Sequence, residues 1–380
     1  MISVAAGTYE PPVCITVAKN LVLQGPPCEP SSGLPEVTIS GNGAHRIFEV
    51  SAGCTLNLKN LAIANGSGSY GGAISASGSL RAEACLFIDN VSSGYGSAIA
   101  AQCGQGCVLF LTNCTFAANT QTGSGGGGAV YVTNGKDNGS AETDAEIYDC
   151  VFVSNTTATC SASALMVNAS NAKVADCTFQ YNSSMSAVFA DNGGGIEFSG
   201  CRFDHNAGAN GTVYFASENT CTFTACDFTL NTVSGASING GGAIYCSGVA
   251  KIVGCAFVSN RVESAAGKGG GALVFGSGSS CSVVTGCVFV ANGLAGSGSG
   301  TSIFVSKGSA AATLVTLSAN YWNDGGFPTI SSTDGSADIY YQMAGGGSSA
   351  VVESFYADLE LTDLRYCVVY VDDDFTEATE

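Results

Sequence analysis

Residues 85–90 read CLFIDN, and this is the first of eight copies of the motif Cys-x-Phe-x-x-Asn. The copies begin 24 to 36 residues apart. They comprise Cys85, Cys114, Cys150, Cys177, Cys201, Cys226, Cys255 and Cys287, then Phe87, Phe116, Phe152, Phe179, Phe203, Phe228, Phe257 and Phe289, then Asn90, Asn119, Asn155, Asn182, Asn206, Asn231, Asn260 and Asn292. A repeat of this length is typical of a solenoid, in which each repeat forms one coil.

The Cys and the Phe of each copy are two residues apart, so on a β-strand both side chains point to the same side. Both are the same in all eight copies, whereas the residue between them varies. We therefore expect Cys and Phe to fill the interior of a narrow tube. The Asn is expected to end the strand, because Asn tolerates the left-handed backbone of a tight corner. Its amide can also bond the equivalent Asn of the coils above and below.

A second motif of small residues followed by apolar ones reads GGAI at 71–74 and 241–244, and GGAL at 270–273. A third, less regular strand precedes each Cys, as in GSLRAEAC at 78–85. Three short strands per repeat predict an all-β fold, a single right-handed parallel β-helix of roughly 11–12 coils. A propeller or a sandwich would need hairpin signals such as Asn-Gly between paired runs, and these variable Gly/Ser-rich spacers do not supply them.

The repeat favours one elongated unit over several globular domains. We predict the β-helix over residues 1–325, with N-terminal capping coils at 1–65 and regular repeats at 66–305. Residues 326–380 are expected to form C-terminal coils or a cap that ends in an acidic tail. Trp322 is expected to plug the last coil of the helix.

The formal charge is −18, with only 12 Lys and Arg residues. Nucleic-acid binding depends on basic side chains that neutralise phosphates, so nucleic acid is excluded as a partner, and anionic membranes and polyuronates are disfavoured. No apolar stretch is long enough for a transmembrane segment. No signal peptide is visible, although an extracellular or cell-surface location is expected. No cofactor is expected.

The 18 cysteines allow two interpretations. In the first, the thiols are small buried hydrophobic groups that stay reduced. In the second, some form disulfides in an oxidising compartment. The candidate pairs are Cys103–Cys107, Cys221–Cys226, Cys281–Cys287, Cys246–Cys255 and Cys14–Cys28. A metal site is not expected from these residues, because no Cys-x-x-Cys or paired His accompanies them.

Two small groups of polar residues are candidate sites. Arg202, Asp204 and His205 lie within one repeat and could act as an acid–base group, although a surface ion pair is the simpler explanation. Asp149 and Asp176 each precede a motif Cys in consecutive repeats, so they should stack about 5 Å apart. They could share a Ca²⁺ ion or raise each other's pKa, and the alternative is a pair of solvated acids.

Apolar residues at outward positions suggest a contact surface. Val151 and Val153 flank one Phe of the motif, and Val258, Val288 and Val290 flank two later ones. Contiguous exposed apolar surface usually marks an interaction site. We expect this face to contact a protein or a glycan at a surface, another copy of the chain, or a terminal segment folded back onto it.

Taken together, Phe-x-x-Asn and Gly-Gly-Ala-Ile/Leu/Val resemble the repeats of the polymorphic outer membrane protein family over residues 55–305. The resemblance implies a surface-exposed β-helix with a role in adhesion. The opening also resembles the pectin-lyase-like superfamily at the level of the fold. A non-enzymatic structural or adhesive β-helix is therefore the first functional interpretation, and a carbohydrate-active enzyme is the alternative.

Overall fold

The computed structural model describes residues 1–28, 31, 33–102, 107–133, 144–158, 160–216, 219–234, 240–263, 269–276, 282–294, 302–305, 313–322, 330–331, 339–341, 348–356, 364–365 and 369–370. These residues form β-strands, turns and bends, and none of them lies in a helix. The chain divides into two compact units, Met1–Glu197 (unit 1) and Phe198–Glu380 (unit 2). The strand β24 (Val188–Ser199) crosses the division.

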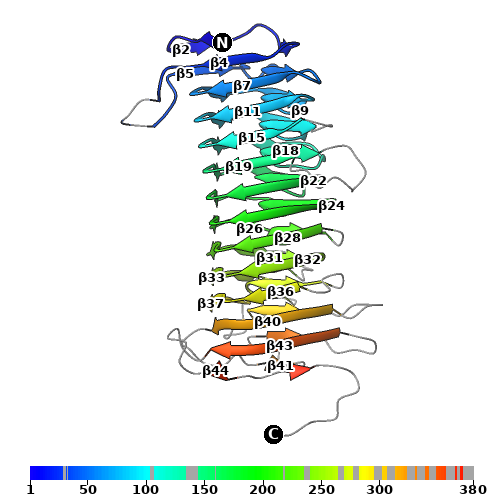
Figure 1. The fold of residues 1–380 in the computed structure, drawn as a ribbon. Helices are drawn as coiled ribbons and strands as arrows, with labels where there is room; N and C mark the ends of the chain where they lie inside the picture. The colour runs from blue at the N-terminus through cyan, green and yellow to red at the C-terminus, as the bar shows by residue number, and fades with distance from the viewer. Residues whose placement is uncertain are drawn as a thin grey trace. The chain divides into compact units, whose positions relative to one another are not determined.

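In unit 1 the strands stack in four rows, within which all pairing is parallel (Figure 1). Row A1 holds β3 (Ile15–Val17), β6 (Phe48–Val50), β10 (Ile74–Ala76), β14 (Ile99–Gln102), β18 (Val130–Thr133) and the start of β22 (Leu165–Ala175). Row A2 holds β1 (Ile2–Ser3), β4 (Leu21–Gln24), β7 (Thr55–Lys59), β11 (Ser79–Glu83), β15 (Leu109–Thr112), β19 (Ala145–Tyr148) and the end of β22.

Row B of unit 1 contains the Cys-x-Phe motif. It holds β2 (Gly7–Tyr9), β5 (Val37–Ser40), β8 (Ala62–Ala64), β12 (Leu86–Ile88), β16 (Thr115–Ala117), β20 (Val151–Val153) and β23 (Thr178–Gln180). Row C holds β9 (Ser67–Tyr70), β13 (Val91–Tyr95), β17 (Thr120–Gln121) and β21 (Thr156–Thr157). The three strands expected in each coil are present, and row C adds a short fourth strand after the Asn.

Unit 2 repeats the four rows. Row A1 holds β27 (Gly211–Phe215), β31 (Gly241–Cys246), β35 (Leu273–Phe275), β39 (Ile303–Val305) and β42 (Ile339–Tyr341), which also pairs with β41 (Ile330–Ser331). Row A2 holds β28 (Asn219–Thr224), β32 (Val249–Val253), β36 (Ser282–Thr285), β40 (Thr313–Trp322) and β43 (Ser348–Tyr356).

Row B of unit 2 holds β25 (Arg202–Asp204), β29 (Asp227–Thr229), β33 (Ala256–Val258), β37 (Val288–Val290) and the end of β40. Row C holds β26 (Ala207–Gly208), β30 (Thr232–Ser234), β34 (Arg261–Glu263) and β38 (Gly293–Leu294). The strands β44 (Leu364–Arg365) and β45 (Val369–Tyr370) pair antiparallel with β43. The parallel stacking confirms the predicted β-helix. The predicted domain boundary at residue 325 stays a prediction.

The core of each unit contains a stack of motif phenylalanines, and every one of these rings is fully buried. In unit 1 the centroids of Phe87, Phe116, Phe152 and Phe179 follow one another at 4.7, 4.8 and 4.8 Å, with the rings within 8° of parallel. In unit 2 the stack runs from Phe203 through Phe228, Phe257 and Phe289. Its spacing equals that of paired strands, so each strand places its ring directly on the ring of the neighbouring coil.

Trp322 continues the stack of unit 2 instead of ending it. Its ring lies 4.5 Å from that of Phe289, at the position of a motif Phe. Asn320 takes the position of the motif Cys, and its Oδ1 accepts a hydrogen bond from the backbone N–H of Cys287 at 2.9 Å. However, β40 also pairs with β43, on the side away from β36 and β37. The coil that contains Trp322 is therefore followed by another coil.

The tight corners do not lie where the sequence suggested. The left-handed residue is the one before the motif Asn, such as Asp89 (φ 54°) and Leu230 (φ 55°), and not the Asn itself. A second left-handed residue precedes the Cys, as at Ala84 (φ 51°). The Asn is instead free to turn its side chain into the core, where all eight copies are buried. Gly71, at the start of GGAI, also has φ +65°, and an added Cβ would collide with the carbonyl O of Ile74.

Candidate functional site

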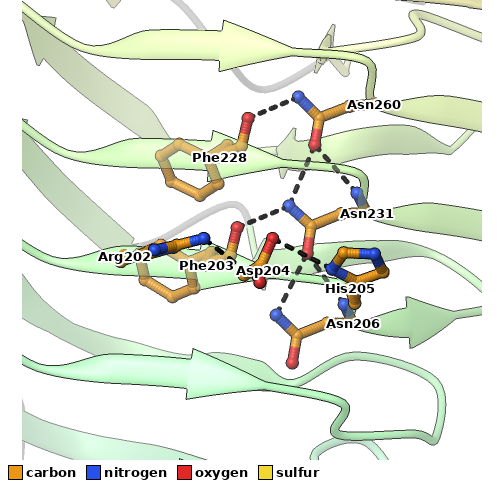
Figure 2. A network of polar contacts seen from close by, with 8 residues as sticks. All are labelled: Arg202, Phe203, Asp204, His205, Asn206, Phe228, Asn231 and Asn260. Carbon is orange, nitrogen blue, oxygen red and sulfur yellow. Dashed lines mark hydrogen bonds and ion pairs between the residues drawn. The ribbon is translucent and has the colours of Figure 1, made fainter.

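The buried asparagines form a hydrogen-bonded ladder in each unit. In unit 2, Nδ2 of Asn206 donates to Oδ1 of Asn231 at 3.0 Å, and Nδ2 of Asn231 donates to Oδ1 of Asn260 at 2.9 Å (Figure 2). The second N–H of the amide donates to the carbonyl O of a Phe in the preceding coil, 2.9 Å from Asn231 to Phe203. The Oδ1 atoms also accept from the backbone N–H of the preceding Asn. The ladder therefore satisfies buried polar atoms that would otherwise be costly.

Arg202, Asp204 and His205 lie beside this ladder on β25 and the corner that follows it (Figure 2). Arg202 Nη2 is 3.4 Å from Asp204 Oδ2, and His205 Nδ1 is 3.0 Å from Asp204 Oδ1. The His205–Asp204 contact is short enough for an ion pair, but its atoms are not aligned as a hydrogen bond requires. The structure thus brings all three sequence candidates together around one carboxylate.

The surroundings of Asp204 explain why this group is compact. Asp204 follows Phe203, so it points outward, yet only 10% of its side chain is exposed. Arg202 and His205, at 58% and 42% side-chain exposure, lie over it and face solvent. The carboxylate contacts the Nδ1 side of the His205 ring. The group therefore has the form of a carboxylate–histidine pair, with Arg202 balancing the charge.

Asp227 is an acid of this face that sequence reasoning missed. It is in register with Arg202 on the next strand of row B, and its side chain is exposed. The signal was available, because Arg202 and Asp227 both directly follow a motif Cys. Asp204 and Asp227 consequently lie on the same outer face, on neighbouring strands, with Arg202 beside both.

The acid pair Asp149 and Asp176 occupies equivalent corners of consecutive coils. Both residues are left-handed, with φ of 52° and 54°, and both are exposed. The backbone N–H of Asp149 donates to the carbonyl O of Ala175 at 3.0 Å, which fixes the stacking of the two corners. Within the described ranges no three His, Cys, Asp or Glu side chains come together as metal ligands. A shared Ca²⁺ at this pair stays a prediction.

The motif cysteines stack like the other motif residues. The backbone N–H of Cys114 lies 3.4 Å from Sγ of Cys150, and the thiol of Cys114 donates to the carbonyl O of Thr112 at 3.3 Å. Burial raises the pKa of the Cys114 thiol, so it stays protonated at neutral pH. The same cause raises the pKa of Cys85.

Among the cysteines that the structure describes, none forms a disulfide. The proposed pairs Cys14–Cys28, Cys221–Cys226 and Cys246–Cys255 are therefore not formed. The physical reason is that a motif thiol meets the equivalent residue of the next coil, as Cys226 meets Cys255, and not a cysteine of its own coil. Cys103 and Cys281, from the other two proposed pairs, lie outside the described residues.

The predicted interaction residues all point outward from row B and are half-buried. Val151 and Val153 belong to unit 1, whereas Val258, Val288 and Val290 belong to unit 2. In unit 1 the same outer face also holds Leu86 and Ile88, which the sequence did not single out because their repeat carries no Val pair. No helix in the described part of the chain has the length and apolarity to cross a membrane.

Comparison with known proteins places this fold in a family. No curated protein matches the chain. Among solved structures, tailspike protein 3 of bacteriophage CBA120 is similar, with a TM-score of 0.38 and 11% identity over 92% of this chain. The matched part is 56% of the phage protein, so the chain spans just over half of its length. Residues 97–342, well over half of the sequence, match the family model for the right-handed β-helix region, and the chain belongs to that family.

Proposed function

We propose that this chain is a non-enzymatic structural or adhesive β-helix that acts outside the cell or at its surface, as a subunit of a larger assembly. Its repeats resemble those of polymorphic outer membrane proteins, and that resemblance implies adhesion. The stacked interior supports a structural role, because the motif residues contact the equivalent residues of neighbouring coils. What varies from coil to coil is the outside, where a partner would bind.

One observation carries the proposal, the outer face of row B in unit 1. Register places Ala62, Leu86, Thr115, Val151 and Thr178 in one column of this face. Ala64, Ile88, Ala117, Val153 and Gln180 form the column beside it. No residue of either column is charged, although the whole chain carries −18. A second copy or an acidic partner could approach here without charge repulsion, and contiguous apolar surface usually marks a contact site.

The test is a double variant, Val151→Asp with Val153→Asp, compared with Ser75→Asp with Thr120→Asp. The control adds the same two charges at half-buried outward positions of rows A1 and C. Light scattering over a range of concentrations would measure assembly, and retention on immobilised cells would measure adhesion. We expect the row B variant to lower both while the control leaves both unchanged. A particle size independent of concentration and of the variant, together with unchanged retention, would refute the proposal.

A carbohydrate-active enzyme is the second candidate, and the Asp204–His205 pair favours it. The buried Asp204 carboxylate lies against Nδ1 of His205, and a carboxylate and an imidazole are the side chains that most often act in general acid–base catalysis. Asp227 would be the second acid that glycoside hydrolysis needs. Release of reducing ends from a polysaccharide, lost in both His205→Ala and Asp204→Asn, would establish this function. Absence of release from neutral and acidic polysaccharides would exclude it.

A further inference from the structure

Six outward side chains of row A2 in unit 1 form a cluster, which we call the A2 face: Lys59, Arg81, Glu83, Phe110, Glu146 and Tyr148. The strands β7, β11, β15 and β19 that carry them lie one beside the next in Figure 1. Register places Arg81, Phe110 and Glu146 in one column. The coils that separate these residues in the sequence differ in length, so only the stacking of the coils brings the residues together.

Two aromatic rings lie at the centre of the A2 face. The guanidinium carbon of Arg81 is 5.4 Å from the centroid of the Phe110 ring. The rings of Phe110 and Tyr148 meet edge to face, with centroids 5.9 Å apart. Both rings point outward and are half-buried, whereas the motif phenylalanines are fully buried in the core. These two rings therefore offer apolar surface to a ligand without being needed to fill the tube.

Four side chains of the A2 face are charged, and two of them form an ion pair. Lys59 Nζ is 2.6 Å from Glu83 Oε1, and the hydroxyl of Tyr148 donates to Glu146 Oε2 at 3.2 Å. The face holds two cations and two anions, and Lys173, in register with Glu146, adds an exposed cation at its edge. The chain as a whole is strongly acidic. A polyanion would have to break the Lys59–Glu83 pair and approach a chain that carries −18 in total, and a polycation would meet no excess of negative charge on this face. A neutral ligand with many hydroxyl groups can bond the outer sides of the same pairs and leave them intact.

We propose that the A2 face binds a neutral, linear polysaccharide, an inference that rests on the proposed adhesive function and specifies its partner. A sugar ring has an apolar face of C–H groups, which fits Phe110 and Tyr148, and a rim of hydroxyls, which fits Arg81 and Glu146.

The stacking of coils also favours a linear chain as the ligand. Equivalent side chains of neighbouring strands are about 4.8 Å apart. The sugar units of a linear polysaccharide follow one another by a step of similar size, so successive units can meet Arg81, Phe110 and Glu146 in turn. The ligand would lie across the strands, along the direction in which the coils stack.

The experiment is native affinity electrophoresis of the full chain in gels that contain hydroxyethyl cellulose, galactomannan, a mixed-linkage glucan or polygalacturonate. The first variant is Phe110→Ala with Tyr148→Ala, and the second is Arg81→Gln, which keeps the size of the side chain. The control is Tyr245→Ala, which removes an outward, half-buried Tyr from row A1 of unit 2. Circular dichroism of each variant checks that the β-structure is retained.

We expect at least one neutral polysaccharide to retard the native chain, and the double aromatic variant to weaken binding by about tenfold, as for an interface anchor. Arg81→Gln should weaken binding by a few-fold, and Tyr245→Ala should leave it unchanged. Retardation by polygalacturonate alone, by none of the gels, or equally in the aromatic variants would overturn the inference. Adhesion that survives Phe110→Ala with Tyr148→Ala but not Val151→Asp with Val153→Asp would overturn the inference alone. Saccharide binding without adhesion would overturn the proposed function alone.

Discussion

The interior and the A2 face of unit 1 are built on the same stacked strands, yet they follow opposite rules. Inside, one contact repeats, such as Phe on Phe at 4.7 to 4.8 Å and Asn on Asn at 3.0 Å. Outside, each contact of the A2 face is different, from an ion pair to an edge-to-face ring pair. An interior residue is constrained by copies of itself above and below. An outer residue has solvent on one side, so it can vary and acquire a binding role.

The largest effect should come from the aromatic stack. Phe116→Ala removes a fully buried ring that lies between Phe87 and Phe152, and we expect it to destabilise unit 1 by about 4 kcal/mol because it leaves a cavity. Denaturant unfolding followed by circular dichroism measures the loss. The matched variant on the outside is Phe110→Ala, which should cost about 1 kcal/mol. Equal losses would erase the distinction between the two regions.

The Asn ladder should give the next largest loss. Asn119→Ala leaves the N–H groups of Asn90 without their acceptor and the carbonyl O of Phe87 without its donor. Buried groups without partners should cost about 3 kcal/mol in total. The comparison is Asn57→Ala, at a half-buried outward position, for which a change near zero is expected. A similar cost for both in thermal and denaturant unfolding would contradict a role for the ladder.

The buried thiols predict a pH dependence. Burial raises the pKa of Cys114 above its ordinary value of 9.0, so the folded chain holds this proton at pH values where the unfolded chain releases it. The stabilisation is complete below pH 9 and is lost as the pH rises above it. Between pH 8 and pH 10 the chain with Cys114 should lose about 1.4 kcal/mol more than Cys114→Ala. Identical pH profiles of unfolding free energy would rule this out.

The corner residues belong neither to the interior nor to the A2 face. A substitution there is expected to stabilise the fold, whereas the substitutions above destabilise it. Leu230 is left-handed, and 44% of its surface is exposed. A branched side chain strains this backbone, whereas Asn tolerates it, so Leu230→Asn should stabilise unit 2 by about 1 kcal/mol. Leu230→Ala, which keeps most of the strain, serves as the control in the same unfolding experiment. If Asn destabilised the chain, Leu230 would have to contribute packing that outweighs the strain.

The smallest effect should come from the exposed ion pair. The side chains of Lys59 and Glu83 are 41% and 52% exposed, so water and salt screen their attraction. Glu83→Gln should lower the unfolding free energy by about 0.5 kcal/mol or less, and the difference should vanish in concentrated salt. A loss of the size expected for Asn119→Ala would show that the outer face also carries stability.

Much of the interior could be predicted from the motif. Cys and Phe two residues apart must share one side of a strand, and eight identical copies require a position where each copy meets another. That reasoning yields the parallel β-helix and the stacked Phe and Asn side chains. It failed at the corners, because the left-handed positions are held by residues as different as Asp89, Ala118 and Tyr181. The geometry is imposed there by the strands on either side and not by the type of the residue.

The candidate site was predictable only where its members are close in sequence. Arg202, Asp204 and His205 lie within four residues, so local spacing brings them together. Asp227 joins them only through the register of β25 and β29. The A2 face depends entirely on register, since loops of different length separate its strands and no motif marks its residues. The amino-acid sequence by itself therefore determined the repeating interior, because the two-residue alternation of a β-strand and the repeated motif both operate within a few consecutive residues. Only the tertiary structure decided which outer side chains meet, because that depends on how much chain each coil uses before it returns to the same row.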